Sequence, residues 1–312
     1  MISVVIPLYN KAPHIEITLR SVLAQTLKPH EIIVVDDGST DGSAEVVQSL
    51  ENNLITLIRQ KNLGVSAARN TGITYASSKY IALLDGDDIW LPSHLETIKE
   101  LITQNPDACL YSTMHEIHLD DHIFTPCSTY PKDYSGEIDD FFLSLANNLS
   151  LINSSTACIR KDIFIDIGGF PIGMKRGEDL VTWIRMARTS GMAHAAKITA
   201  IYNRNAINRS SALREKQAPG SLLYLQSLIQ SSDLSTHEIV SARLLFERIS
   251  FYTAAGMKES SDIEGLVEIR KLAAQMHMPK LSAKLFLLTV TPKLALTYAR
   301  RFRHHHTNSN NG

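Results

Sequence analysis

Cysteine and long apolar runs are scarce in this chain. Three cysteines lie far apart among 312 residues, and their odd number argues against a disulfide framework. No apolar run reaches the roughly 20 residues that a membrane-spanning helix needs. Residues 1–7 have neither the basic region nor the cleavage site of a signal peptide, so we expect a first strand there. These absences predict a cytoplasmic protein.

Acidic residues are absent from residues 269–312, which therefore carry a charge of +8. The net charge of −1 leaves −9 for the rest of the chain. Apolar residues at helical spacing permit two interpretations of this segment. It is either a helical subdomain packed on the rest of the chain, or an amphipathic segment on the inner face of an anionic membrane. We expect no nucleic-acid partner. The basic residues are Arg270, Lys271, Lys280, Lys284, Lys293, Arg300, Arg301 and Arg303.

The dinucleotide-binding pattern Gly-x-Gly-x-x-Gly is also missing. An oxidoreductase on a related sheet would place backbone amides and a helix N-terminus at the pyrophosphate. This chain has adjacent carboxylates there, so an oxidoreductase is the disfavoured alternative.

Strand-like and helical patterns alternate through the first hundred residues. Apolar runs rich in β-branched residues lie at 3–6, 31–35, 54–58 and 80–84, and most of the stretches between them repeat apolar residues at helical spacing. This alternation predicts an α/β fold in which helices cover both faces of a mostly parallel sheet. From about residue 221 the pattern is helical only, which predicts a C-terminal helical region.

Two helix starts are predicted from local sequence. Thr40 or Asp41 is expected to cap the helix that follows the second strand. Ser93 and Glu96 have the spacing of a capping box, which predicts reciprocal hydrogen bonds at the start of the fourth helix. Residues 85–90 then form the loop before that helix.

Three acidic clusters at wide spacing are the most informative pattern in the chain. They are residues 36–41, 85–88 and 177–179, and the first two directly follow predicted strands. Crowded carboxylates repel one another, so a cation or hydrogen-bond donors must lie between them. Ligands of open α/β sheets bind beyond the carboxyl ends of the strands, where the first two clusters fall. A divalent metal that carries a diphosphate fits this need.

Asp85 and Asp87 are the candidate metal ligands. Alternate side chains of a tight turn can converge on one hard cation, which prefers oxygen ligands and retains substrate phosphate oxygens. Asp87 is the expected ligand, with Asp85 beside it. The alternative is a turn whose aspartates only shape the loop.

Asp37 and Arg69 are candidate nucleotide contacts. Asp37 can accept the imide N–H of a pyrimidine base, or it caps the helix that starts near residue 41. Arg69 lies on a helix of small residues and could reach the base or the diphosphate. An ordinary surface arginine is the alternative.

Glu178 and Asp179 follow Gly177 at the start of a predicted helix, where the helix dipole favours ionised carboxylates. An ionised carboxylate can act as a general base, although its low pKa limits its basicity unless the pKa is tuned upward. The alternative is that these side chains only cap the helix.

Six motifs in order resemble glycosyltransferase family 2, whose members have the GT-A fold. They cover roughly residues 1–205, and the C-terminal helical part lies outside the resemblance. The motifs are Val4-Val5-Ile6-Pro7-Leu8-Tyr9-Asn10, residues 33–43, Gly64-Val65-Ser66-Ala67-Ala68-Arg69-Asn70, Leu83-Leu84-Asp85-Gly86-Asp87-Asp88, Gly168-Gly169-Phe170, and Glu178-Asp179 with Arg185.

This resemblance implies roles for single residues. Asp179 resembles the catalytic base, with Glu178 as the second candidate. Asp85 and Asp87 resemble the Asp-x-Asp motif that binds the donor and Mn²⁺ or Mg²⁺. The candidates for binding the nucleotide or donor are Pro7, Tyr9, Asp37, Arg69, Asp85 and Gly86.

One stretch departs from the family pattern. Many relatives have a Tyr-Arg-x-His-like segment followed by Ser, whereas residues 202–210 contain no histidine. In place of that histidine, Arg204 or Arg209 could supply positive charge to the diphosphate that leaves during sugar transfer.

The resemblance implies a metal-dependent, inverting glycosyltransferase of surface polysaccharide biosynthesis. It would move a sugar from a nucleoside-diphosphate donor, with a UDP-sugar favoured, to a saccharide or lipid-linked acceptor. The alternative is a catalytically silent nucleotide-sugar-binding partner in a polysaccharide-assembly complex, against which the intact Asp87 and Asp179 argue.

The expected organisation has three parts. Residues 1–212 form a GT-A catalytic domain, with a nucleotide-sugar-binding half at about 1–105 and an acceptor half at about 106–212. Residues 213–303 form a helical subdomain, and 304–312 form a disordered tail.

Overall fold

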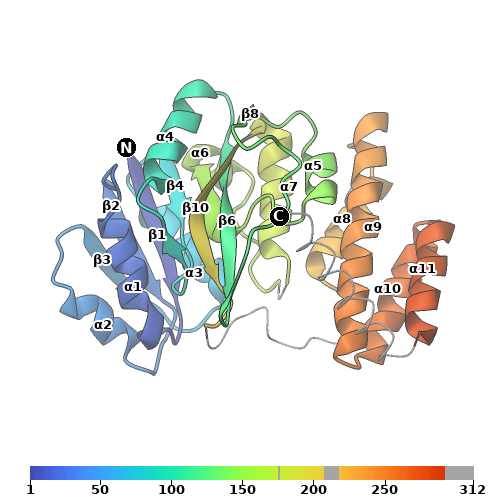
Figure 1. The fold of residues 1–312 in the computed structure, drawn as a ribbon, viewed down its shortest axis with the longest axis horizontal. Coiled ribbons are helices and arrows are strands. Elements are labelled where there is room, and N and C mark those ends of the chain that lie inside the picture. The colour runs from blue at the N-terminus through green and yellow to red at the C-terminus, as the bar shows by residue number, and fades with distance from the viewer. Residues whose placement is uncertain (175, 207–217, 292–312) are drawn as a thin grey trace, which may run out of the picture. The chain divides into compact units, whose positions relative to one another are not determined.

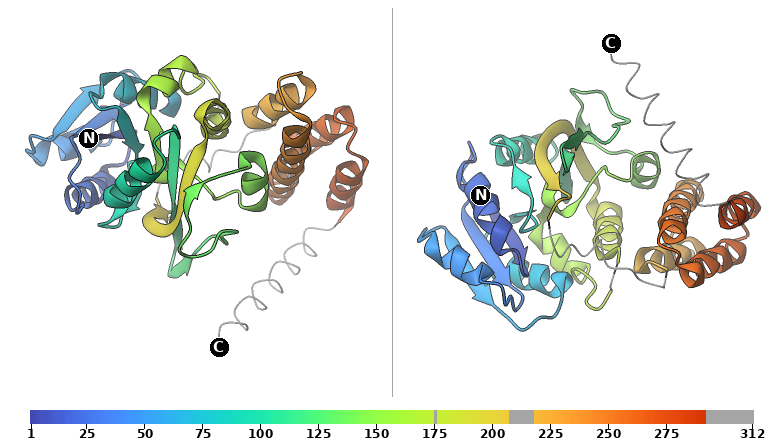
Figure 2. Two further views of the ribbon diagram at one scale, coloured as in Figure 1. Left: turned by 90° about the horizontal axis from the view of Figure 1, so that it is seen from above. Right: turned by 60° about the horizontal axis from the view of Figure 1, so that its bottom comes forward.

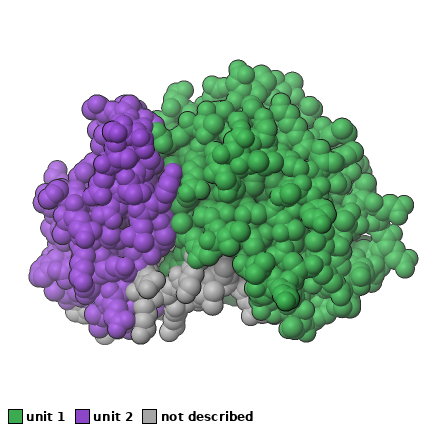
Figure 3. Space-filling view, turned by 180° about the vertical axis from the view of Figure 1, so that it is seen from behind, with its two compact units in different colours: residues 1–212 green, residues 213–312 purple. Residues whose placement is uncertain are grey.

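The computed structural model describes residues 1–174, 176–206 and 218–291. The chain divides into two compact units, residues 1–212 and residues 213–312 (Figure 3). Unit 1 contains all three acidic clusters. The described part of unit 2 is almost entirely helical.

Unit 1 is built on one ten-stranded mixed sheet among the described residues (Figure 1). Its main path runs in the order β3-β2-β1-β4-β9-β6-β10-β5. Strands β1, β2, β3, β4, β6 and β10 all point the same way, because β9 is antiparallel to both β4 and β6. The strands are β1 (Ile2–Leu8), β2 (Glu31–Asp36), β3 (Ile55–Arg59), β4 (Tyr80–Leu83), β5 (Ile89–Trp90), β6 (Leu110–Leu119), β7 (His122–Phe124), β8 (Ser135–Glu137), β9 (Ala157–Arg160) and β10 (Met192–Asn203).

Helices flank the sheet, so the predicted α/β fold with a mostly parallel sheet is confirmed (Figures 1 and 2). A 3-10 turn, η1, covers Ser154–Thr156 just before β9. The helices of unit 1 are α1 (Ala12–Leu23), α2 (Ser43–Ser49), α3 (Val65–Tyr75), α4 (His94–Gln104), α5 (Phe141–Asn147), α6 (Lys161–Asp166) and α7 (Glu178–Ser190).

Alternation along β1 explains why both faces of the sheet are covered. Val4 and Ile6 pack in one core cluster with side chains of α1, α2 and α4. Val5 points to the opposite face, where a Cβ added at Gly72 of α3 would lie only 2.5 Å from its Cγ1. A central strand buried on both faces needs the continuous β-branched run that the sequence has.

Both predicted helix caps are wrong in detail. The residue before α2 is Gly42, and the carboxylate of Asp41 accepts from the backbone N–H groups of Ser43 and Ala12, the first residues of α2 and α1. Asp41 thus serves two helix starts. Ser93 precedes α4 without a side-chain cap, because the carboxylate of Glu96 accepts a hydrogen bond from the Thr26 hydroxyl instead.

Unit 2 contains four described helices, which share an apolar core. Helix α11 packs against α9 and α10 with its leucines at 281, 285 and 288 buried, and Lys284 pairs with Glu247 at 2.6 Å. The basic residues from Lys293 onward lie outside the described residues, so the membrane contact stays a prediction. No described helix is long and apolar enough to cross a membrane. The helices are α8 (Gly220–Gln230), α9 (Thr236–Glu259), α10 (Ile263–Gln275) and α11 (Pro279–Val290).

His94 on α4 gives unit 1 a pH-dependent stability. The ring is fully buried, stacks on Trp90 with centroids 4.1 Å apart, and bonds Thr199 through Nδ1. Its buried Nε2 has no hydrogen-bond partner among the described residues, and burial lowers the pKa to about 3. The folded state therefore binds fewer protons than the unfolded state below the ordinary histidine pKa, and stability is lost as the pH falls from about 6.5 towards 3.

We expect His94 to contribute about 2 kcal/mol to the loss of unfolding free energy between pH 7 and pH 5. Urea unfolding of the wild type and His94→Gln at both pH values measures this, because titrating carboxylates cancel in the difference. Parallel pH dependence of the two proteins would contradict the expectation. The exposed His30, replaced in the same way, is the control.

Candidate functional site

The carboxyl ends of the parallel strands bring the predicted donor residues to one edge of the sheet. Leu8 of β1 is in register with Asp36 of β2, and the backbone N–H of Asp37 donates to the Leu8 carbonyl at 2.8 Å. Gly86 packs against β1, since an added Cβ would lie 3.2 Å from the Pro7 carbonyl oxygen. Tyr9 directly follows β1 and is 43% exposed.

The loop after β1 is fixed by the turn after β2. Asn10 has a left-handed backbone, with φ of 52°, which asparagine adopts more readily than most residues. Its backbone N–H donates to Ser39 Oγ at 3.0 Å, and its side-chain oxygen accepts from the Thr40 N–H at 2.8 Å. The next backbone N–H, of Lys11, donates to Ser43 Oγ at 2.8 Å.

Asp37 shapes the loop that leads into α3. Its carboxylate accepts hydrogen bonds from Gln60 Nε2 at 2.7 Å, from the Leu63 N–H at 2.9 Å and from the Gly64 N–H at 2.8 Å. Capping of the helix near residue 41 is therefore not its role. A carboxylate has about four acceptor positions. Three of them are taken by protein donors, and the base contact stays a prediction.

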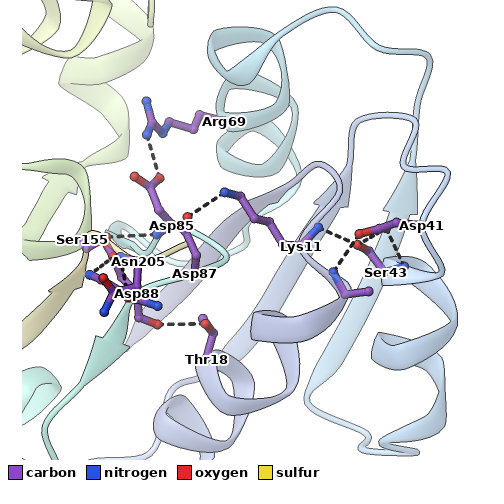
Figure 4. Close-up of polar contacts among 12 residues, drawn as sticks. Lys11, Thr18, Asp41, Ser43, Arg69, Asp85, Asp87, Asp88, Ser155 and Asn205 are labelled. Carbon is purple, nitrogen blue, oxygen red and sulfur yellow. Dashed lines mark hydrogen bonds and ion pairs between the residues drawn. The ribbon is translucent and has the colours of Figure 1, made fainter. Parts of the chain in front are cut away.

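The second acidic cluster gives each carboxylate a different partner (Figure 4). Asp85 bonds Arg69 Nη2 at 2.7 Å, and Asp87 bonds Lys11 Nζ at 2.7 Å. Asp88 accepts from Ser155 Oγ at 2.5 Å and from the Asn203 N–H at 2.9 Å. Burial and the charge of Asp85 raise the pKa values of both Asp87 and Asp88. The cluster is held by these contacts and not by the loop's own turn alone.

Asp88 is a structural anchor and is buried. It connects the loop after β4 to the end of β10, and its carbonyl accepts from the Thr18 hydroxyl of α1 at 2.8 Å. Just beyond that anchor, the N–H of Arg204 donates to the His118 carbonyl at 2.8 Å. Arg209, the other candidate for the missing histidine, lies outside the described residues.

Arg69 is a buried bridge and not a surface arginine. Only 5% of its side chain is exposed, and besides Asp85 it contacts Glu178 Oε1 through Nη1 at 3.4 Å. Its guanidinium also lies over the Phe170 ring, 5.3 Å from the centroid. The second and third acidic clusters therefore meet at one cation, as their mutual repulsion requires.

Asn70 holds Phe170 in this arrangement. Its side-chain amide donates to the Phe170 carbonyl and accepts from the Phe170 N–H, both at 2.9 Å. A Cβ at Gly169 would lie 2.9 Å from Asn70 Oδ1, so the turn needs glycine there. Of these two adjacent residues of α3, Asn70 thus binds the backbone of Phe170, and Arg69 lies over its ring.

Glu178 and Asp179 begin α7 with raised pKa values. Burial and the neighbouring Asp179 raise the pKa of Glu178 to about 7, against the opposing charge of Arg69. Burial also raises the pKa of Asp179, whose Oδ1 accepts from the Leu180 N–H at 2.7 Å. This upward tuning is what a carboxylate base requires.

The acidic edge fits a divalent cation that is shared with a substrate. In residues 1–174, 176–206 and 218–291, no group of three or more His, Cys, Asp or Glu side chains gathers to hold a metal. Mg²⁺ and similar ions commonly take one or two carboxylates and complete their shell with water and phosphate oxygens. Asp87 already holds a cation, the Lys11 ammonium, and Asp85 is 33% exposed. These two oxygen donors match that chemistry.

Three contributors to the site are missing from the sequence interpretation. Asn70 is the last residue of the motif at residues 64–70 and directly follows Arg69, and this position is a signal that points to it. Ser155 and Lys11 carry no local signal, because their partners Asp88 and Asp87 are 67 and 76 residues away in sequence.

Comparisons with known proteins agree with the motifs. The glycosyl transferase family 2 model matches residues 3–168. An uncharacterized glycosyltransferase of Nostoc sp., alr2836, is 33% identical over 177 residues, which are 55% of this chain and 53% of that protein. Glycosyltransferase AglE of Haloferax volcanii is 31% identical over 209 residues, 61% of this chain and 62% of that protein. The matches thus span less than two thirds of either relative.

The fold is also found in solved structures. Residues 1–349 of S. aureus TarS in complex with UDP-GlcNAc match with a TM-score of 0.71 at 19% identity, over 88% of this chain and 80% of that chain. The same TarS segment in complex with UDP gives a TM-score of 0.69 at 18% identity, over 92% and 86%. At such identity the likeness shows the fold.

Proposed function

The chain belongs to glycosyltransferase family 2, and we propose that it transfers a sugar from a nucleoside-diphosphate donor to a hydroxyl of a saccharide or lipid-linked acceptor. A UDP-sugar is the favoured donor, since the TarS structure of the same fold contains UDP-GlcNAc. Surface polysaccharide biosynthesis is the favoured context. The observation that carries the proposal is the Arg69 bridge, which joins donor-side Asp85 to Glu178 beside the candidate base.

The proposed reaction is a single displacement with inversion. Asp179 takes the proton of the acceptor hydroxyl, and the freed oxygen forms a bond to the anomeric carbon. The bond from that carbon to the diphosphate oxygen breaks, and the nucleoside diphosphate leaves with the electron pair. Asp179 has a pKa raised by burial, so it holds a proton more firmly than an exposed aspartate would.

Positive charge on the donor side supports the leaving group. Mn²⁺ or Mg²⁺ held by Asp87 and Asp85 would neutralise the charge that develops on the diphosphate. Arg69 keeps Asp85 in place through its 2.7 Å bond. We place the nucleotide near Pro7, Tyr9 and Asp37, at the carboxyl ends of β1 and β2.

UDP is expected to bind more tightly with Mn²⁺ than with EDTA, because Asp87 and Asp85 bind the diphosphate only through a cation. Calorimetry of the wild type measures this, and a thermal-shift screen of nucleotide sugars, with UDP-GlcNAc first, identifies the donor. Asp87→Ala should abolish the Mn²⁺ dependence, whereas Asp107→Ala, at an exposed turn, should keep it.

Equal UDP affinity with Mn²⁺ and with EDTA would contradict the metal role of Asp87 and Asp85. Binding of NAD without any binding of UDP would contradict the glycosyltransferase proposal itself. Donor binding without sugar transfer to any acceptor, unaffected by substitution of Asp179, would favour the catalytically silent partner.

A further inference from the structure

Lys11 places a cation where the donor's own cation is expected. It lies between β1 and α1, and its ammonium is 2.7 Å from Asp87 Oδ2 (Figure 4). Each of these two side chains is only 11% exposed. The pair is therefore shielded from solvent, and its attraction is stronger than that of a surface ion pair.

The backbone of Lys11 is fixed at the start of two helices. Its N–H donates to Ser43 Oγ, and its carbonyl accepts from the His14 N–H at 2.9 Å and the Ile15 N–H at 3.0 Å. Asp41 holds the Ser43 hydroxyl in turn, at 2.5 Å. Movement of the ammonium therefore comes from the side chain, whose four-carbon stem is flexible.

The two buried cations of the site differ in their freedom to move. Arg69 contacts two carboxylates and an aromatic ring, and its planar fork has a fixed geometry. Lys11 presents a compact charge that can turn from one anion to another nearby. A divalent cation that approaches Asp87 competes directly with the ammonium. A diphosphate that arrives with the cation offers the displaced ammonium a new anion.

We propose that Lys11 is a positioning residue that holds Asp87 until the donor arrives and then moves to the donor's diphosphate. This inference rests on the proposed function. Its consequence is that the divalent cation binds weakly alone and strongly together with a nucleoside diphosphate. Such coupling between two ligands is reciprocal, so the diphosphate also binds strongly only with the cation.

Neutral substitution of Lys11 separates these effects. Lys11→Met removes the competing charge, so Mn²⁺ alone should bind about tenfold more tightly than to the wild type, within the usual range of coupling between sites. The same variant lacks the ammonium that would contact the diphosphate. The factor by which UDP tightens Mn²⁺ binding should therefore fall by about tenfold.

Electron paramagnetic resonance of free Mn²⁺ measures both quantities in titrations with and without UDP. The proteins are the wild type, Lys11→Met, Lys11→Gln as a second neutral variant, and Lys28→Met as the control. Lys28 is exposed and donates to the Leu23 carbonyl of α1, away from the carboxylates. Lys11→Arg, which keeps the positive charge, should retain weak binding of Mn²⁺ alone.

Three outcomes separate this inference from the proposed function. Tighter Mn²⁺ binding and reduced coupling in both neutral variants support it. Unchanged Mn²⁺ affinity in a folded neutral variant overturns it, although the wild type still couples UDP to Mn²⁺. A wild type without any such coupling overturns the metal role in the proposed function, and the Lys11 inference falls with it.

Discussion

Replacing Arg69 with methionine is expected to lower the free energy of unfolding by about 3–5 kcal/mol, as when one partner of a buried ion pair is removed. The reason is that Asp85 loses the cation beside it, and Glu178 must either stay charged without that cation or take up a proton. Methionine fills similar apolar volume, so the packing against Phe170 changes little. Urea unfolding at pH 7 measures the loss, and sugar transfer should be lost with it.

The pH dependence of this variant identifies the cause. Glu178, with a pKa already raised to about 7, should accept a proton more readily once Arg69 is gone. The variant's Glu178 pKa lies above the wild-type value, so the deficit should shrink as the pH falls from about 9 towards 7 and should change little below that. Arg20→Met is the control, because Arg20 forms an exposed pair with Glu16 whose loss should cost less than about 1 kcal/mol. A deficit no larger than that of the control would contradict the bridge.

Asp179→Asn should lower the turnover rate by roughly 10²–10⁴-fold, the usual contribution of a general base. Asparagine keeps the shape of the side chain but cannot accept the acceptor's proton. UDP affinity should stay close to that of the wild type, since the donor contacts lie on other elements. Steady-state kinetics with the donor found by the screen, together with calorimetry, separates the two quantities.

The pH profile distinguishes Asp179 from Glu178 as the base. The wild-type rate should fall as the pH drops below about 7, because the coupled pair then gains its first proton. Glu178→Gln should move this limb to lower pH, since Asp179 loses a negative neighbour. Loss of transfer in Glu178→Gln, with transfer preserved in Asp179→Asn, would reverse the assignment.

Strand and helix periodicity predicts the first part of the fold well and the middle part poorly. The runs that became β1, β2 and β4 are largely apolar, because both faces of those strands are buried. By contrast, β6 appears in the sequence as short pieces, since its ten residues change from fully buried to half-buried along their length. The reversed direction of β9 depends on pairing with β4 and β6, and a local pattern does not encode it.

The candidate site shows the same limit at the level of side chains. Motifs located Asp85, Asp87 and Asp179, because each follows a recognisable strand or begins a helix. The partner of each charge is set by tertiary contact: Arg69 and Glu178 are 109 residues apart in sequence. Likewise, a capping pattern for Glu96 was present, but Thr26 competed for its carboxylate.

The left-handed turn at Asn10 has a thermodynamic consequence for ligand recognition. Its hydrogen bonds to Ser39 and Thr40 hold the backbone beside Tyr9 in one conformation before any nucleotide arrives. Ordering a free backbone residue costs roughly 1–2 kcal/mol. That cost is met during folding, so little of the affinity for a nucleotide is lost to freezing this loop.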